Sequence, residues 1–225
     1  SALTFYVLFT LASLYTHYYD VFILAALNIF VLAFALWGRR WKMLARWLGA
    51  QIALVVFYAP WVLFGTNRIT TYGEASAEQS VSLIDILNRS VSAFFLSETV
   101  PATLRETVWI PLTLLLVAIL IYLTQRNRGR AAFLSLYIAV PTLALYVLSI
   151  GRPLFLERYL NGIAPAYYLV LAIGLAALWQ WQSKWRMVAV TIPAVFLIAS
   201  SAFAIWSFQF DPAFAKSPDW RDLMR

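Results

Sequence analysis

Seven long apolar stretches separated by shorter polar connections organise the chain up to about residue 208. In the hydrocarbon core of a bilayer each stretch must be helical, because an unpaired backbone group there costs several kcal/mol. A membrane β-barrel is excluded, since its strands would alternate polar and apolar residues. We therefore predict an all-α membrane protein, a polytopic bundle of about seven transmembrane helices. The predicted spans are Ala2–Thr16, Tyr19–Trp37, Trp47–Phe64, Val108–Leu123, Ala131–Ile150, Leu160–Trp179 and Met187–Phe208.

The composition agrees with a membrane protein. Of the 225 residues, 63% are apolar and 12% are charged, against about half and about a quarter in a soluble domain. The chain has no cysteine, which excludes disulfides and thiolate metal sites. Its net charge of +7 would suggest nucleic acid in a soluble protein, but membrane topology explains the basic clusters. We expect no nucleic-acid partner.

The distribution of charge orients the bundle. The connections at 38–46, 125–130 and 180–186 carry basic residues and no acidic ones, whereas all ten acidic residues lie on the other side. By the positive-inside rule these three connections are cytoplasmic. We therefore predict a multi-pass protein of the cell (inner or plasma) membrane with an external C-terminus. The predicted external segments are His17–Asp20 and residues 65–107, 151–159 and 209–225.

The external segment 65–107 is too long to be a simple turn. Its second half has helical periodicity over residues 82–96, with Leu83, Ile84 and Val91 on one face and polar residues, among them Ser92, on the other. Ser82 and Asp85 resemble a capping box at its start. This pattern predicts an amphipathic helix at the outer membrane surface, either as a structural flap or as a gate over a substrate site.

The domain organisation follows from the same patterns. Residues 1–208 form the predicted transmembrane bundle, including the external segment 65–107. Residues 209–225 shift to Asp, Lys, Pro and Trp, which is typical of the start of an external soluble domain. Ser1 leads directly into apolar sequence without a basic start, so we expect the bundle to be the C-terminal part of a larger membrane domain.

Polar residues beside apolar spans are the first candidates for function in a membrane protein. His17 is the only histidine, and Asp20 follows three residues later, so the two side chains can share a helical face. One interpretation is a histidine that is merely hydrogen-bonded at a helix junction. The alternative is an active-site role as a metal ligand, a proton carrier or a substrate contact.

A second polar cluster lies between the fifth and sixth predicted spans. Arg152 and Arg158 are six residues apart and flank Pro153 and Glu157 at the membrane boundary. Arginine offers a planar fork of donors that matches phosphate oxygens, which favours binding of a lipid phosphate. The alternatives are a snorkelling arginine and an Arg–Glu surface pair of little energetic weight. Signatures of soluble enzymes, such as a Walker A loop or a nucleophile elbow, are absent from the sequence.

Short motifs in both clusters carry a resemblance to a known family. Leu14–Tyr19 resembles the "lYtHY" element of polyprenyl-phosphate-dependent glycosyltransferases of the GT-C superfamily, in the protein-mannosyltransferase and aminoarabinose-transferase branch. Arg152–Phe155, followed by Glu157–Leu160 and Pro165, is similar to that branch's "RPlf..RYl....P" element. Pro218–Arg221 is similar to the start of its external C-terminal domain.

The resemblance implies an enzyme that transfers a sugar, with inversion, from a polyprenyl-phosphate donor to an acceptor protein or glycolipid on the external face. The aspartate that serves as base in this family is expected upstream of Ser1, so this chain alone should be inactive. Some relatives hold a divalent metal near the site, so a divalent metal stays an open alternative as cofactor, but one histidine without a matched ligand set assigns no metal ligand here. The implied residues are Arg152, Arg158 and Tyr159 at the donor phosphate and His17, Tyr18, Asp20 and Glu157 in the active-site cavity.

Two alternatives to a transferase stay open. A non-enzymatic lipid-phosphate carrier or flippase would use the same arginines, although such proteins typically have inverted repeats and broken helices, which the sequence does not indicate. A purely structural bundle would use the arginines only as anchors. The transferase hypothesis predicts that His17, Arg152 and Arg158 converge at one external cavity beneath the 82–96 helix.

Overall fold

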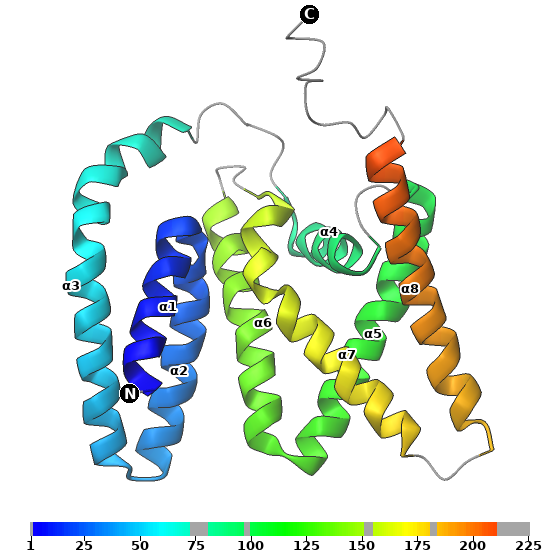
Figure 1. The fold of residues 1–225 in the computed structure, drawn as a ribbon, viewed down its shortest axis with the longest axis horizontal. Coiled ribbons are helices and arrows are strands. Elements are labelled where there is room, and N and C mark those ends of the chain that lie inside the picture. Colours follow the sequence, from blue (N-terminus) through cyan, green and yellow to red (C-terminus); the bar gives the residue numbers. More distant parts are fainter. Residues whose placement is uncertain (1, 73–80, 97–99, 151–154, 181–183, 211–225) are drawn as a thin grey trace, which may run out of the picture. The chain divides into compact units, whose positions relative to one another are not determined.

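The protein is helical throughout the part of the chain that the structure describes. A computed structural model describes residues 2–72, 81–96, 100–150, 155–180 and 184–210 (Figure 1). These residues contain helices and turns and no strand, which confirms the predicted all-α class. The elements are α1 (Ala2–Thr16), η1 (Tyr18–Asp20), α2 (Val21–Trp37), α3 (Trp41–Tyr72), α4 (Leu83–Phe95), α5 (Ala102–Arg126), α6 (Arg128–Ser149), η2 (Glu157–Ile163), α7 (Ala164–Trp179) and α8 (Arg186–Phe210), where η marks a 3-10 helix.

Six helical segments of the described residues are long and apolar enough to cross a bilayer. They correspond to six of the seven predicted spans. The seventh, α1, has 15 residues, which is about 22 Å at 1.5 Å per residue, against about 30 Å of hydrocarbon. The six segments are Tyr18–Trp37, Trp41–Phe64, Thr103–Arg126, Arg128–Ser149, Glu157–Trp179 and Met187–Phe210.

The helices run further into the basic connections than hydropathy predicts. α3 begins at Trp41, although the apolar pattern starts only at Trp47. Lysine and arginine are good helix formers, so a basic segment next to a span can continue its helix. The connection between α2 and α3 therefore shrinks to a turn at residues 38–40, where Arg39 has a φ of 49°.

The chain divides into two compact units. Unit 1 comprises residues 1–86 and 120–168, and unit 2 comprises residues 87–119 and 169–225. The predicted boundary between a bundle at 1–208 and an external domain at 209–225 stays a prediction, because residues 211–225 lie outside the described residues.

Unit 1 is built on contacts between membrane-spanning helices. α2 packs against α6 and α3, and α1 packs against α3. On α2 the small residues Ala26 and Ala35 are buried, which lets helix backbones approach closely where lipid supplies no hydrophobic driving force. The rings of Phe30 on α2 and Phe133 on α6 meet edge to face, with centroids 5.3 Å apart.

Polar side chains also connect α1, α2 and α3. Gln51 on α3 donates from Nε2 to the Tyr6 hydroxyl at 3.2 Å and accepts at Oε1 from Asn28 Nδ2 at 3.3 Å. Trp47 Nε1 donates to Asn28 Oδ1 at 2.8 Å. These four residues, Tyr6, Asn28, Trp47 and Gln51, are called the Gln51 network. Because hydrocarbon offers no other partner, their hydrogen bonds hold the three helices together.

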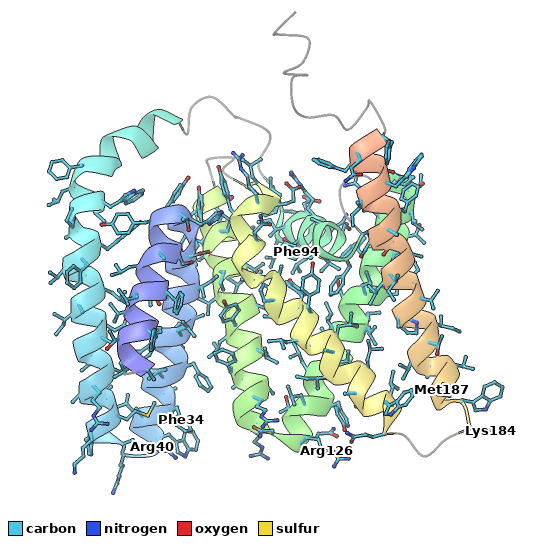
Figure 2. The ribbon with its side chains drawn as sticks, in the orientation of Figure 1. Phe34, Arg40, Phe94, Arg126, Lys184 and Met187 are labelled. Carbon is cyan, nitrogen blue, oxygen red and sulfur yellow. The ribbon has the colours of Figure 1, made fainter. Side chains whose placement is uncertain are left out.

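The two ends of unit 1 differ in charge. Arg40 in the α2–α3 turn and Arg126 at the end of α5 lie at the same end, as Figure 2 shows. Arg40 stacks on the Phe34 ring at 4.2 Å from its centroid. Asn127 caps α6 there by accepting a hydrogen bond from the backbone of Arg130 at 3.0 Å. The opposite end of unit 1 carries η1 and η2, so the basic turns and the two candidate clusters are separated by the length of the helices.

The helix α4 lies within the segment for which periodicity predicts a helix. Ser82 Oγ accepts from the Asp85 backbone N–H at 3.1 Å, and Asp85 Oδ2 accepts from the Ser82 backbone N–H at 3.0 Å, which forms a capping box. The predicted faces are partly wrong. Ser92, assigned to the polar face, is buried and donates to Asn88 Oδ1 within the helix at 3.0 Å, whereas Ile84 is 64% exposed. The position of α4 at the outer membrane surface stays a prediction.

Unit 2 contains the later part of α4, α5 up to residue 119, α7 from residue 169, and α8. α5 and α7 approach closely at Gly174, where an added Cβ would lie 2.4 Å from Ile119 Cδ1. Ser200 on α8 donates to the Phe95 carbonyl at 3.4 Å. Beside this contact, the end of α4 and the face of α8 that carries Ala204 line a mostly apolar cavity of about 330 Å³.

Candidate functional site

Most of the predicted site residues fall on two short 3-10 helices of unit 1. His17 occupies the break between α1 and η1, with extended backbone angles of φ −142° and ψ 92°. Tyr18 and Asp20 belong to η1, and Glu157, Arg158 and Tyr159 belong to η2. Arg152 lies outside the described residues, so its predicted place beside Arg158 stays a prediction.

The structure brings η1 and η2 together although they are far apart in the sequence. The rings of Tyr19 and Tyr159 stack with centroids 4.0 Å apart. The His17 ring meets Tyr159 edge to face, with centroids 6.4 Å apart. His17 therefore lies beside Tyr159, the neighbour of Arg158 in the chain, and a stacked pair of tyrosines lies at the centre of the contact. The convergence of His17, Arg152 and Arg158 at one external cavity beneath the 82–96 helix stays a prediction.

Gly162 permits this approach of the two 3-10 helices. A Cβ at this position would lie 2.4 Å from Ile23 Cδ1 and 2.7 Å from Asp20 Oδ1, closer than side-chain atoms pack. The Gly162 carbonyl in turn accepts a hydrogen bond from the Tyr137 hydroxyl on α6 at 3.3 Å. η2 is thus held between α6 and the start of α2 by a residue without a side chain.

Arg158 is the cation of this cluster. Its guanidinium carbon lies 5.5 Å from the centroid of the Tyr159 ring, a cation–π geometry that fixes the side chain without neutralising its charge. The residue is exposed, and within the described ranges it has no carboxylate within ion-pair distance. Its five N–H donors are therefore available to an anion.

Asp20 is held by its neighbours in the chain. Ser13, on the last turns of α1, donates from Oγ to Asp20 Oδ2. Asp20 Oδ1 lies 3.7 Å from His17 Nδ1, a distance too long for a hydrogen bond. The extended backbone of His17 allows this arrangement, because it folds η1 back onto the end of α1.

A row of aromatic rings extends the cluster towards α3. The Tyr18 ring lies tilted against Tyr19 at 4.4 Å and stacks on Trp61 at 6.0 Å, and Trp61 stacks on Tyr58 at 5.2 Å, measured between ring centroids. The Tyr58 hydroxyl donates to the Leu14 carbonyl on α1 at 3.4 Å. The row therefore connects the end of α1, η1 and α3 into one rigid surface.

Several residues of this cluster were not expected from the sequence. Tyr19 and Gly162 stand inside or beside the quoted motifs, so motif membership was the available signal for both. Ser13 precedes His17 by one helical turn, which is a weak signal by itself. Trp61 was interpreted only as apolar span sequence, and nothing in its local pattern indicates that it meets Tyr18.

The described residues give no ligand set for a metal. Within them, no group of three or more His, Cys, Asp or Glu side chains lies close enough together to hold an ion. Glu157 and Tyr18, predicted to line the cavity, lie on η2 and η1 respectively, and their contacts with a substrate stay predictions.

No protein-family model matches the chain, and no curated protein or solved structure shows significant similarity to it. The residues of the η1–η2 cluster and their geometry are therefore the basis for proposing a function.

Proposed function

We propose that this chain is part of an integral-membrane glycosyltransferase that moves a sugar from a polyprenyl-phosphate donor to an acceptor on the external face of the membrane. The cluster formed by η1 and η2 binds the donor. The observation that carries the proposal is the contact between η1 and η2, because it unites the two motifs of the suggested family through the Tyr19–Tyr159 stack.

The chemistry of a sugar phosphate fits the residues at this contact. The phosphate is already a good leaving group, so the reaction needs stabilisation of developing negative charge more than it needs an acid. Arg158 supplies a permanent positive charge with donors spaced for phosphate oxygens. Its guanidinium group lies over the Tyr159 ring, which itself stacks on Tyr19 of η1, and Arg152 is the second arginine that the proposal assigns to the phosphate.

The end of unit 1 that carries the cluster supports an external site. Arg40 and Arg126 lie at the other end, which the positive-inside rule assigns to the cytoplasm. A carrier for lipid phosphates could use the same arginine. The segments Tyr18–Trp37 and Glu157–Trp179 begin as 3-10 helices at the cluster, and the other described spanning helices are each continuous, whereas many carriers bind substrate at helices broken near the middle of the membrane.

The proposal is tested by binding and by turnover. The chain is placed in nanodiscs and titrated with a polyprenyl monophosphate, with the variants Arg158→Ala and Arg126→Ala beside it. Arg126 is a matched control, because its guanidinium carbon also lies over a tyrosine ring, at 5.6 Å from the centroid of Tyr122. A hydrogen-bonded charge contributes about 1.5–3 kcal/mol, so Arg158→Ala should weaken binding about 10- to 100-fold and Arg126→Ala should leave it unchanged.

Equal losses in the two variants would show a nonspecific charge effect and contradict the proposed site. Turnover is measured in membranes that contain the intact transferase of which this chain is proposed to be a part, as release of free polyprenyl phosphate from a polyprenyl-phosphate-linked sugar when an acceptor is added. We expect Arg158→Ala to abolish this release. Binding without release in the unaltered protein would identify a carrier instead.

A further inference from the structure

His17 differs from a histidine that is merely hydrogen-bonded at a helix junction, because one of its ring nitrogens is buried while part of the ring is exposed. Its Nδ1 is buried and has no hydrogen-bond partner in the described part of the chain. The side chain as a whole is 32% exposed. Because Nδ1 is shielded, the exposed part of the ring is on the side that carries Nε2.

The group that faces the buried nitrogen is the Asp20 carboxylate, at 3.7 Å. An unprotonated Nδ1 would direct its lone pair at an oxygen that carries negative charge, which is repulsive. A protonated Nδ1 would direct a donor at an acceptor, and a small rotation of the ring would close the hydrogen bond. The electrostatics therefore favour a proton on Nδ1.

Asp20 is itself fixed on its other sides. Ser13 donates to Oδ2, and the backbone of Gly162 lies against Oδ1 so closely that a Cβ there would be 2.7 Å away. The other titratable groups of the described residues whose contact with the imidazole is seen are the rings of Tyr19 and Tyr159, with centroids at 6.1 and 6.4 Å. These rings restrict the tilt of the imidazole and offer no acceptor as strong as a carboxylate.

We propose that Asp20 is a positioning residue that holds neutral His17 with its proton on Nδ1, so that Nε2 is presented to the cluster as a hydrogen-bond acceptor. Ser13 and Gly162 fix Asp20 for this purpose. Such a nitrogen suits a ligand group that donates a hydrogen. The ionised phosphodiester of a polyprenyl-phosphate-linked sugar has no hydrogen to donate, so in this tautomer His17 accepts from a hydroxyl while Arg158 binds the phosphate.

The identity of the molecule that carries this hydroxyl rests on the proposed function. In glycosyl transfer it is a hydroxyl of the sugar or of the acceptor. The tautomer itself depends only on the contacts within unit 1, so the two proposals can fail separately.

The chain offers a direct measurement, because it contains one histidine. The protein is prepared with ¹⁵N-labelled histidine and a purification tag that lacks histidine, and is reconstituted in lipid without sugar-based detergent. Nitrogen NMR then reports which ring nitrogen of His17 carries the proton. At a pH where the imidazole is neutral, we expect the Nδ1–H form to dominate.

Variants assign this preference to its cause. Asp20→Ala should abolish the excess of Nδ1–H, Asp20→Asn should retain part of it through the amide oxygen, and Ser13→Ala should reduce it. Glu106→Gln is the matched control, since it removes a carboxylate from an exposed position of unit 2 and should leave the spectrum unchanged. If Asp20→Ala fails to fold, the unaltered protein and Ser13→Ala still test the proposal.

Two results would overturn the inference: an Nε2–H form that dominates in the unaltered protein, or an Nδ1–H form that persists undiminished in Asp20→Ala. An Nδ1–H form in a protein that binds no polyprenyl monophosphate would support the role of Asp20 and count against the proposed function. An Nε2–H form in a protein that binds the phosphate would count against the role of Asp20 and support the proposed function.

Discussion

Replacing Gly162 with alanine tests whether the contact between η1 and η2 is as close as the structure shows. The new methyl group would lie 2.4 Å from Ile23 Cδ1 and 2.7 Å from Asp20 Oδ1. Ordinary contacts between such atoms are about 3.5–4.0 Å, so the neighbours must move by about 1 Å. Overpacking of this kind costs about 1–3 kcal/mol. We expect Gly162→Ala to lower the stability of the protein by that amount.

The two clashes can be separated because they involve different side chains. Ile23→Val deletes Cδ1 alone and by itself should cost about 0.5–1.5 kcal/mol. Combined with Gly162→Ala it removes the contact with Ile23 and leaves the contact with Asp20. The coupling free energy of this double-mutant cycle therefore measures the share of the strain borne by Ile23, and the remainder is borne by Asp20.

Gly49→Ala is the matched control. A Cβ at position 49 would meet nothing within 4 Å, and alanine is favoured over glycine inside a helix by about 1 kcal/mol. Thermal unfolding in detergent, followed by circular dichroism, should therefore show Gly49→Ala equal to or more stable than the unaltered protein and Gly162→Ala less stable. A Gly162→Ala variant as stable as Gly49→Ala would refute the close approach of η2 to Asp20.

Three further predictions follow from other parts of the structure. Gln51→Leu removes two hydrogen bonds of the Gln51 network and should destabilise the protein by about 1–2 kcal/mol, measured by thermal unfolding; an unchanged melting temperature would show that the network does not hold the helices. Ser82→Ala removes the N-cap of α4 and should weaken that helix by about 1 kcal/mol. The effect should be seen as faster amide hydrogen exchange in α4 alone, and exchange at the rate of the unaltered protein would argue against the cap. Because the chain has no cysteine, Thr16→Cys should react with a membrane-impermeant thiol reagent added to whole cells and Arg40→Cys should not. The opposite labelling pattern would show that the topology is the inverse of the predicted one.

The sequence predicts the spanning helices well because their cause is local. Each span follows from a run of apolar residues long enough for a bilayer, and α2, α5 and α6 lie close to their predicted positions. The boundaries fail where helix propensity and hydropathy disagree. The segment from Trp41 to Arg46 is helical but contains the charged residues Lys42 and Arg46, so a criterion based on apolarity leaves it out of the helix.

The faces of α4 show a different limit. Helical periodicity places Ser92 among polar residues, yet the serine is buried. Its hydroxyl donates a hydrogen bond to Asn88 one turn earlier in the helix. A small hydroxyl that is satisfied within its own helix can be buried at little cost. Periodicity cannot distinguish this serine from one that faces water, since the two differ only in what packs on the helix.

The candidate site was predictable from the sequence in part of its residues and in none of its contacts. The two motifs name His17, Arg158 and Tyr159, and their charges suggest a phosphate. The stacking of Tyr19 on Tyr159 and the close approach of η1 and η2 at Gly162 depend on how α2 packs against α6. That packing involves residues far apart in the sequence. No local pattern encodes that packing.

The assignment of chemistry to this cluster depends on which side of the membrane it faces. Arg158 and His17 lie at the end of unit 1 opposite Arg40 and Arg126, so one labelling result for Arg40→Cys fixes the compartment of all four residues. If the basic turns are cytoplasmic, a water-soluble nucleotide sugar of the cytoplasm cannot reach Arg158, so under the proposed transferase function the activated sugar arrives on a lipid carrier that crosses the membrane. The exposed Arg158 and the proposed acceptor nitrogen of His17 suit such a donor, because the donor presents its phosphate and its sugar hydroxyls at the same membrane boundary. Inversion of the topology would remove that requirement, and with it the reason to expect a lipid-linked substrate.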